Sequence, residues 1–359
     1  MERYFRQKKL IDREKEIKFF IDWFEKISDE ILWIYGPKSS GKTTIIEYVV
    51  ENELFEDFWK FIPKKNYWIR YMNLRGYLIT SYKTFLEAFI KPKKESKRKK
   101  ESIDARMSIG IFEIKASILN EVKEREKDLF NVLISEIQQI AKDKRVIIII
   151  DEIQTLEEIY INGDRELLKE FLNFCVRLTK ELHIAHVVIL SSNTIFIDRI
   201  YNDAKLKVTS RFYKIDHLGY ETVKNWLEKE GFSSSEIELI WEYLGGGIAY
   251  IQRMIRDRNE FPTLEEYLKH QAWLAYTEIV DYLGRGNTEE EEMIFREIAK
   301  IIVNEGEFRI RDDLKDKGKF IKVIDKWAEK EILFFDPMSL QVTGNSRIYG
   351  KGMEILVGS

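Results

Sequence analysis

The chain has 359 residues, of which 44% are hydrophobic and 34% are charged, and its formal net charge is only -3. This length favours two or three domains, and the nearly neutral balance excludes a protein that is basic over its whole surface. Cys175 is the single cysteine, and we find neither an apolar signal core nor an uncharged run long enough to cross a bilayer, so we expect a cytoplasmic protein without membrane contact.

The first part of the chain alternates short apolar, β-rich runs with helical patterns. Such an alternation is typical of a parallel sheet that is covered by helices on both faces. It predicts an α/β core over residues 1–217, built on a five-stranded parallel sheet. The five runs are EILWIYG (30–36), YWIRYMN (67–73), RVIIIIDE (145–152), HVVILSSN (186–193) and FYKID (212–216).

A loop that matches the phosphate-binding pattern G-x-x-x-x-G-K-[ST] follows the first run. Its glycines permit turns that aim backbone N–H groups at phosphate oxygens, at the positive end of the following helix. Lys42 is expected at the β- and γ-phosphates of ATP, Thr43 at Mg²⁺, and Thr44 beside the α-phosphate. A chance polar turn is the alternative, and the flanking strand and helix argue against it. The matching residues are Gly36, Pro37, Lys38, Ser39, Ser40, Gly41, Lys42 and Thr43.

An acid pair, Asp151 and Glu152, ends the most apolar run. Acids at the end of a buried parallel strand lie at the carboxyl edge of the sheet, beside the phosphate loop. We expect Asp151 to hold a water of the Mg²⁺ ion, and Glu152 to orient and deprotonate the water that attacks ATP. The alternative is that the pair forms a helix N-cap with a capping acid.

Asn193 and Arg211 are less specific catalytic candidates. Asn193, or Ser191 or Ser192 beside it, could bond the attacking water or the γ-phosphate; the alternative is a polar turn at the strand end. Arg211 precedes the fifth run, and we expect that connection to follow the carboxyl edge of the sheet. Arg211 could then reach a γ-phosphate in its own chain or in a neighbour's, with a surface ion pair as the alternative.

The pattern changes twice outside these motifs. Seven of the ten residues in 91–100 are basic, and we interpret 91–101 as a solvated loop, with nucleic-acid contact as the alternative. From residue 218 the strand-like runs stop, and amphipathic patterns predict a helical lid over 218–284. Residues 285–359 show helices followed by β-rich segments, which predicts a winged helix-turn-helix domain.

The expected recognition helix of that last domain carries a stripe of four lysines. At about 100° per residue they share one side of the helix, as phosphate contacts would require. However, residues 285–359 hold 13 Lys or Arg against 15 Asp or Glu, so we prefer a protein-interaction or autoinhibitory module to contact with duplex DNA. The four residues are Lys319, Lys322, Lys326 and Lys330.

These motifs, in this order, resemble a AAA+-type P-loop ATPase. The segments IDREKEI, IYGPKSSGKT, IIIIDEIQTL and LGGG are similar to the archaeal ATPase family allied to the signal-transduction ATPases with numerous domains (STAND). The segments ILSSNTIFIDRI and TSRFYKIDHLGY resemble, more distantly, the archaeal origin-recognition initiators. The resemblance implies an AAA+-like P-loop fold, with Ile11 and Arg13 near the adenine base. It departs from the initiators after the lid glycine, where Ile248 and Ala249 replace a phosphate-sensing arginine and Arg253 comes a turn later.

Three functions fit these observations. The first is a Mg²⁺-dependent ATPase, with slow turnover, that acts as a nucleotide-controlled switch on an unidentified protein client. The second is a DNA-binding initiator or regulator that ATP loads onto duplex DNA. The third is a structural adaptor with a degenerate nucleotide site, against which the intact Lys42, Thr43, Asp151 and Glu152 argue.

Overall fold

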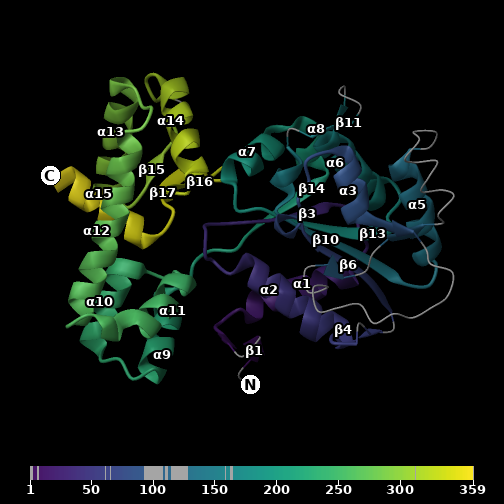
Figure 1. Cartoon of the computed structure of the whole chain (residues 1–359), viewed down its shortest axis with the longest axis horizontal. Coiled ribbons are helices and arrows are strands. Elements are labelled where there is room, and N and C mark those ends of the chain that lie inside the picture. The colour runs from purple at the N-terminus through teal and green to yellow at the C-terminus, as the bar shows by residue number, and fades with distance from the viewer. Residues whose placement is uncertain are drawn as a thin grey trace.

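A computed structural model describes residues 3–5, 8–60, 62–64, 66–92, 108–109, 112–114, 128–157, 159–161, 165–311 and 313–358. The basic run 91–101 therefore lies almost entirely outside the described residues. Figure 1 shows an α/β core at one end of the molecule and a largely helical part at the other. Within the described ranges, no helix is both long and apolar enough to cross a membrane.

A six-stranded sheet in the order β14–β3–β13–β10–β6–β8 forms the centre of the core. Five strands run parallel, and the short β8 joins the edge in the antiparallel direction. The predicted five-stranded parallel sheet is thus confirmed, with one short strand added. The strands are β3 (Ile31–Tyr35), β6 (Tyr67–Asn73), β8 (Ser108–Ile109), β10 (Arg145–Asp151), β13 (Ala185–Leu190) and β14 (Ser210–Lys214).

Helices cover both faces of this sheet, which explains why β10 is apolar at nearly every position. Ile147 and Ile149 belong to the cluster under α1 and α2, whereas Ile148 and Ile150 belong to the cluster under the helices of the opposite face. One face carries α1 (Glu14–Glu25), α2 (Lys42–Tyr48) and its π-helical continuation Val49–Leu54. The other carries α3 (Tyr82–Phe89), α5 (Leu129–Ile140), α6 (Leu167–Val176) with its π-helical continuation Arg177–Glu181, α7 (Thr194–Asn202) and α8 (Ala204–Val208).

Short strand pairs lie outside the main sheet. They are β1 (Arg3–Phe5) with β2 (Lys8–Leu10), β4 (Phe55–Asp57) with β5 (Ile62–Pro63), β7 (Ile90–Pro92) with β9 (Phe112–Ile114), and β11 (Tyr160–Ile161) with β12 (Arg165–Glu166). The β7–β9 pair is parallel and the other three pairs are antiparallel.

Four helices follow the core, where the sequence predicts a helical lid. Ser233 caps α10 and forms a capping box with Glu236, and Thr263 caps α12. Both caps satisfy backbone N–H groups that a helix start would otherwise leave unpaired. The helices are α9 (Tyr220–Lys229), α10 (Ser234–Leu244), α11 (Ile248–Asp257) and α12 (Leu264–Leu283).

The lid glycines have a packing role, and Gly246 has the strictest one. A Cβ at Gly246 would lie 1.9 Å from the carbonyl oxygen of Leu218, and the two residues are joined by a backbone hydrogen bond of 3.0 Å. We expect Gly246→Ala to lower the free energy of unfolding by about 1–3 kcal/mol, since a well-packed backbone must shift. Chemical denaturation would measure this, with Gly284→Ala as the control, because its Cβ would meet atoms only at 3.7 Å. Equal denaturation midpoints for Gly246→Ala and Gly284→Ala would contradict the packing role of Gly246.

The C-terminal region contains a three-stranded sheet, ordered β15–β17–β16, beside three helices. The short middle helix that the winged helix-turn-helix prediction requires is not formed among the described residues of 310–316, so that assignment stays a prediction. The elements are α13 (Glu289–Glu305), β15 (Phe308–Arg309), α14 (Lys317–Glu329), β16 (Leu333–Asp336), β17 (Gln341–Gly344) and α15 (Arg347–Gly358).

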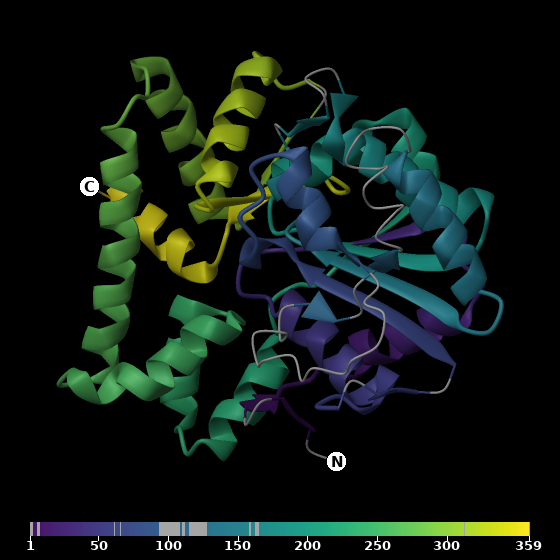
Figure 2. The ribbon, with the colours of Figure 1, turned by 45° about the vertical axis from the view of Figure 1, so that its right-hand side comes forward.

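Helix α12 ties the lid to the C-terminal region. Ala272 and Ala275 are buried in the lid cluster, whereas Ile279 and Leu283, farther along the same helix, are buried in the C-terminal cluster. Figure 2 shows α12 as one long helix that spans the height of this part of the molecule. The two regions therefore share a continuous helix, and a movement of the lid would carry the C-terminal region with it.

Candidate nucleotide-binding site

The phosphate loop follows β3 at the carboxyl edge of the sheet, and its first glycine is sterically required. Gly36 has a φ of 147°, and a Cβ there would lie 2.1 Å from the carbonyl oxygen of Ile215. Ser39 also has a positive φ, of 64°, which a non-glycine residue adopts only where the surrounding structure holds it. The loop thus has the tight, defined shape that a phosphate cradle needs.

Lys42 lies folded into this loop. Its ammonium group donates hydrogen bonds of 2.9 Å to the carbonyl oxygens of Gly36 and Pro37. Burial lowers the pKa of Lys42 to about 8, against the opposing attraction of Asp151 and Glu152. A buried cation with an incompletely compensated charge favours an anionic partner, and phosphate oxygens would supply one.

Thr43 and Asp151 meet where the sequence predicts a metal site. The Thr43 hydroxyl donates to Oδ2 of Asp151 over 2.8 Å, and Asp151 is 3% exposed at the end of β10. Burial raises the pKa of Asp151 to about 6, although the Thr43 hydrogen bond opposes the shift. A hydroxyl and a carboxylate are hard oxygen donors, so this pair fits Mg²⁺.

Glu152 is held in place by two side chains that the sequence analysis did not single out. It adopts a left-handed backbone, with φ of 62°, and its Oε1 accepts from Nη2 of Arg75 at 2.5 Å. Its Oε2 accepts from Nε2 of Gln154 at 2.6 Å, and Gln154 also accepts from the Ser191 hydroxyl. The Glu152 side chain makes no capping hydrogen bond, which removes the support for the N-cap alternative.

Arg75 and Gln154 each carry a weak signal in the sequence. Arg75 lies in the 3₁₀ turn Leu74–Gly76, directly after β6, and Gln154 follows the acid pair by two residues. Polar residues just past neighbouring parallel strands gather at one edge of a sheet. Only the strand order shows that both side chains reach Glu152.

Asn193 acts as a helix cap. Its Oδ1 accepts from the backbone N–H of Phe196 at 3.0 Å, at the start of α7. The neighbouring Ser191 hydroxyl bonds Gln154 and is 1% exposed. The side-chain carbonyl of Asn193 is therefore engaged locally, so a role toward the attacking water would fall to its amide nitrogen and remains a prediction.

Arg211 lies away from the phosphate loop. It pairs in register with Leu32, near the amino end of β3, whereas the loop follows Tyr35 at the carboxyl end. The expectation that the connection before β14 runs along the carboxyl edge is wrong, because a parallel strand is entered from the amino edge. The Arg211 guanidinium instead lies 5.6 Å from the ring of Phe19 and 5.4 Å from that of Trp23, both on α1, in cation–π contacts.

Known proteins resemble this chain in sequence and in structure. A model of an ATPase domain found predominantly in Archaea matches residues 10–254. The chain belongs to this family. An uncharacterized ATP-binding protein of Methanocaldococcus jannaschii is 32% identical over 341 residues, covering 90% of each chain. One of Pyrococcus abyssi is 31% identical over 339 residues, covering 91% of this chain and 92% of that protein.

Solved structures agree with the fold of this ATPase domain. A Walker-type ATPase of Pyrococcus abyssi superposes with a TM-score of 0.60 at 13% identity, covering 96% of each chain. The ORC2 protein of Aeropyrum pernix gives a TM-score of 0.50 at 10% identity, covering all of this chain and 97% of that one. The expected AAA+-like P-loop fold is confirmed; at such identities the likeness concerns the fold alone.

Two further groups brace the phosphate loop of the ATPase domain from outside it. Arg13 is 5% exposed, and its Nη2 donates to the carbonyl oxygens of Ser40 and Asp216 at 2.7 and 2.8 Å. The side chain of Ile248, first residue of α11, lies 3.6 Å from where a Cβ on Gly41 would be. Arg13 therefore supports the loop directly, while its expected place near the adenine base stays a prediction.

The C-terminal region also contacts the phosphate loop, a contact that no sequence motif predicts. The backbone N–H of Lys38 donates to Oδ1 of Asn345 at 3.0 Å, and the Lys38 ammonium pairs with Glu331. Beside the loop, the Tyr35 hydroxyl donates to Oδ1 of Asp336 at 3.1 Å. Asn345 and Asp336 are both buried, so these contacts belong to a formed interface.

Proposed function

We propose that this chain binds Mg²⁺-ATP at the phosphate loop and hydrolyses it slowly, as a nucleotide-controlled switch. The carrying observation is that Lys42, the Thr43–Asp151 pair and Glu152 come together at one edge of the sheet. The relatives named as ATP-binding proteins support the same ligand. Mg²⁺ held by Thr43 and Asp151 would supply a positive charge that neutralises phosphate oxygens.

The residues of the chain divide the chemistry between them. Lys42 would exchange its two loop carbonyls for phosphate oxygens, which stabilises the charge that develops on them during transfer. Glu152 would accept a proton from the attacking water, and Arg75 and Gln154 orient its carboxylate through the bonds of 2.5 and 2.6 Å. Because Arg75 also competes with the water for this carboxylate, its release would be part of activation.

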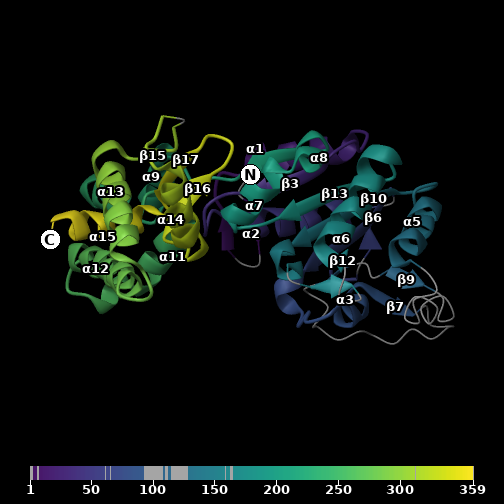
Figure 3. The same cartoon turned by 90° about the horizontal axis from the view of Figure 1, so that it is seen from above.

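In this switch, the C-terminal region is the part that moves. Asn345 and Glu331 bind Lys38 in the loop, so a change of loop shape on nucleotide binding would act directly on the C-terminal region. Helix α14 meets α7 at the same interface, since Ile195 of α7 is buried in the C-terminal cluster. Figure 3 shows the C-terminal elements on one side of the core, next to α7. Measuring ATP turnover with Mg²⁺ and with EDTA tests the proposed ATPase activity. The absence of turnover under both conditions would contradict that activity.

Asn345→Ala tests the coupling between loop and C-terminal region. We expect ATP affinity to stay within about threefold, because Asn345 is proposed to transmit the change and not to hold ATP. Hydrogen exchange in β16 and β17 should become faster, since the interface loses the bond from Lys38 and the Asn345 side chain no longer bonds the Glu331 carbonyl oxygen. Gln341→Ala is the control, because its side chain accepts a hydrogen bond from the nearby Ser339 and has no contact with the phosphate loop among the described residues. Unchanged exchange in Asn345→Ala would contradict the coupling.

The interface should respond to pH through Asp325 on α14. Burial, with Asp198 of α7 and Glu329 nearby, raises the pKa of Asp325 to about 6, while Arg199 opposes the shift; burial also raises the pKa of Asp198. A group whose pKa is raised on docking binds its proton more tightly when docked, so docking strengthens as pH falls through 6. Hydrogen exchange in β16, corrected for its intrinsic pH dependence, should slow in acid. Asp325→Asn should reduce that residual dependence, because Asp198 still titrates at the interface; an undiminished dependence would refute the assignment.

The DNA-binding alternative finds less support. Lys319 pairs with Glu290, Lys326 pairs with Glu291 at 3.1 Å, and Lys330 lies 5.4 Å from the ring of Tyr282. None of the four stripe lysines is buried, as the helix frame predicts. However, three of them are engaged within their own part of the molecule, and α14 packs on α7. Contact between this stripe and a duplex would require the lysine contacts and the packing of α14 on α7 to be released.

A further inference from the structure

A cavity at the amino edge of the sheet lies opposite the phosphate loop. Its volume is about 700 Å³, within the range of about 300–1,000 Å³ typical of small-molecule sites. The strands β6, β10 and β13 contribute Tyr67, Arg145 and His186 at their amino ends, while Asp151 ends β10 at the far edge. No motif of the nucleotide site uses any of these three residues.

Strand pairing places the three side chains on one face. Arg145 is directly opposite Tyr67, and His186 is opposite Ile147, two residues beyond Arg145. Residues two apart in a strand point to the same side, so all three lie on the α1 face, beyond the apolar core that contains Ile147. The end of α1 completes the wall with Glu25.

The cavity is held open by fixed contacts. The Ser28 hydroxyl donates to the Ala185 carbonyl oxygen at 2.5 Å, and Nδ1 of His183 lies 2.7 Å from the Ser28 carbonyl oxygen. Nη1 of Arg145 donates to the Phe24 carbonyl oxygen at 2.8 Å, which anchors the guanidinium against the end of α1. These bonds join three segments that are far apart in the sequence, so the shape exists before any ligand arrives.

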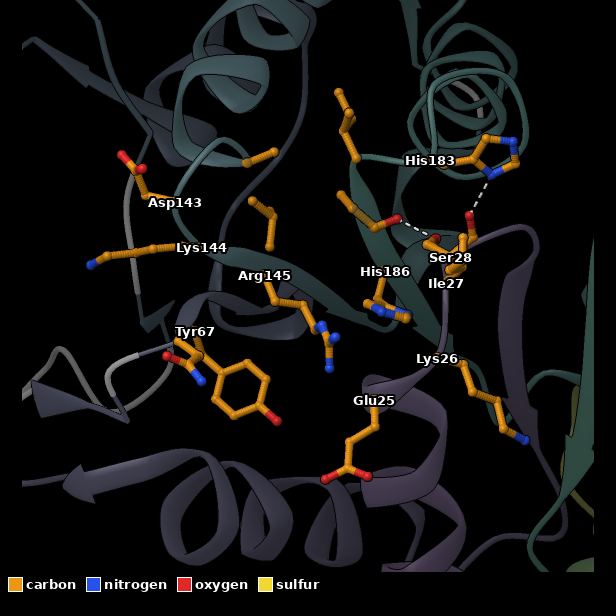
Figure 4. A pocket seen from close by; sticks show the side chains of 15 residues that line it. Glu25, Lys26, Ile27, Ser28, Tyr67, Asp143, Lys144, Arg145, His183 and His186 are labelled. Carbon is orange, nitrogen blue, oxygen red and sulfur yellow. Dashed lines mark hydrogen bonds between the residues drawn. The ribbon is translucent and has the colours of Figure 1, made fainter.

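Polar groups from three strands and the end of α1 converge on this space. In Figure 4 the side chains of Arg145, His186 and Tyr67 reach toward a shared space, with Glu25 below them. Lys144 points away from it. Nδ1 of His186 is buried in the cavity wall and, among the described residues, has no hydrogen-bond partner. Within the described ranges, neither the Tyr67 hydroxyl nor the Glu25 carboxylate has a hydrogen-bond or ion-pair partner.

The charged groups around this space favour opposite charges on one ligand. The Arg145 guanidinium suits a carboxylate, which it binds through parallel N–H donors. Glu25 and the negative end of the α1 dipole suit an ammonium group. Burial lowers the pKa of His186 to about 4, so its ring stays neutral and adds no positive charge that would repel an ammonium group. A simple anion would leave Glu25 unused, and a simple cation would leave Arg145 unused.

We infer that this cavity is a second ligand site, which takes a free α-amino acid. The carboxylate lies on Arg145, and the ammonium group lies against Glu25 at the carboxyl end of α1. Ile27, which is 79% exposed at the rim, and Ile184 offer apolar surface to the amino-acid side chain. The site is independent of ATP, since it lies at the opposite edge of the sheet.

Calorimetric titration of the full chain with each proteinogenic L-amino acid, at millimolar concentration, tests this site. At least one amino acid should bind, its methyl ester should not, and the matching α-hydroxy acid should bind more weakly. Arg145→Gln and Glu25→Gln should each weaken binding at least about tenfold, because a charge-assisted hydrogen bond is lost. Lys144→Gln, whose side chain points away, is the matched control and should bind as wild type.

The outcomes separate the site from general effects on folding. Glu25 is exposed, so Glu25→Gln should keep the wild-type melting temperature, and Mg²⁺-ATP affinity should be unchanged in all three variants. Binding of no amino acid would overturn the inference. Binding that survives both Arg145→Gln and Glu25→Gln, or that Lys144→Gln weakens equally, would overturn it as well. Binding of the ester as tightly as the acid would refute the role of Arg145.

Discussion

Lys42→Ala should abolish detectable ATP binding while the chain stays folded. The ammonium group is buried inside the phosphate loop, and within the described residues it donates to the carbonyl oxygens of Gly36 and Pro37. Removing it takes away charge-assisted bonds to phosphate, each contributing about 1.5–3 kcal/mol. The substitution also removes a charge whose burial costs free energy when no ligand is bound. Equilibrium binding of a fluorescent ATP analogue measures the effect, and the melting temperature checks the fold.

Lys38→Ala is the matched control in the same loop. Lys38 contributes its backbone N–H to Asn345 and its ammonium to Glu331, so truncation leaves the cradle itself intact. Its ATP affinity should stay within about threefold of wild type, under 1 kcal/mol. If Lys42→Ala also stays within that range, the assignment of the site to this loop is wrong.

Glu152→Gln should keep ATP bound and stop its hydrolysis. The amide has the shape of the carboxylate and can still accept the hydrogen bond from Arg75, but it cannot take a proton from water. Loss of a positioned general base lowers a rate by about 10²–10⁴-fold. Single-turnover hydrolysis with pre-bound Mg²⁺-ATP isolates this step from binding and product release.

Glu157→Gln is the control for that experiment. Glu157 lies in the same segment but pairs with Arg199 at 2.7 Å, away from the phosphate loop. Its single-turnover rate should equal that of wild type. An unchanged rate in Glu152→Gln would mean that another group activates the water. A rate lost in both variants would point to a change in the segment as a whole.

The phosphate loop and the acid strand could be predicted because their signals are local. The loop needs glycine where no Cβ fits, as at Gly36 against Ile215, and a lysine and a hydroxyl at the start of a helix. β10 must be apolar on both sides because helices cover both faces of the sheet. Such constraints act within a few residues, so Lys42, Thr43, Asp151 and Glu152 could be assigned from the pattern alone.

Contacts between distant segments were decided by the tertiary structure alone. Arg211 appeared to precede a strand at the nucleotide edge, but the parallel direction of β14 sends it to the opposite edge, onto Phe19 and Trp23. Arg75 reaches Glu152 because β6 lies next to β10 in the sheet order. Strand order and direction are properties of the whole sheet, and no local pattern encodes them.

Domain packing decided the remaining features in the same way. Asn345 meets the backbone of Lys38 across 307 positions of the chain, and the cavity at the amino edge forms from three strands and the end of α1. Neither feature has a sequence motif, since each residue on its own is an ordinary polar side chain. Sequence by itself predicted the chemistry of the phosphate loop, whereas the fold determined which distant segments contact that loop and formed the cavity at the amino edge.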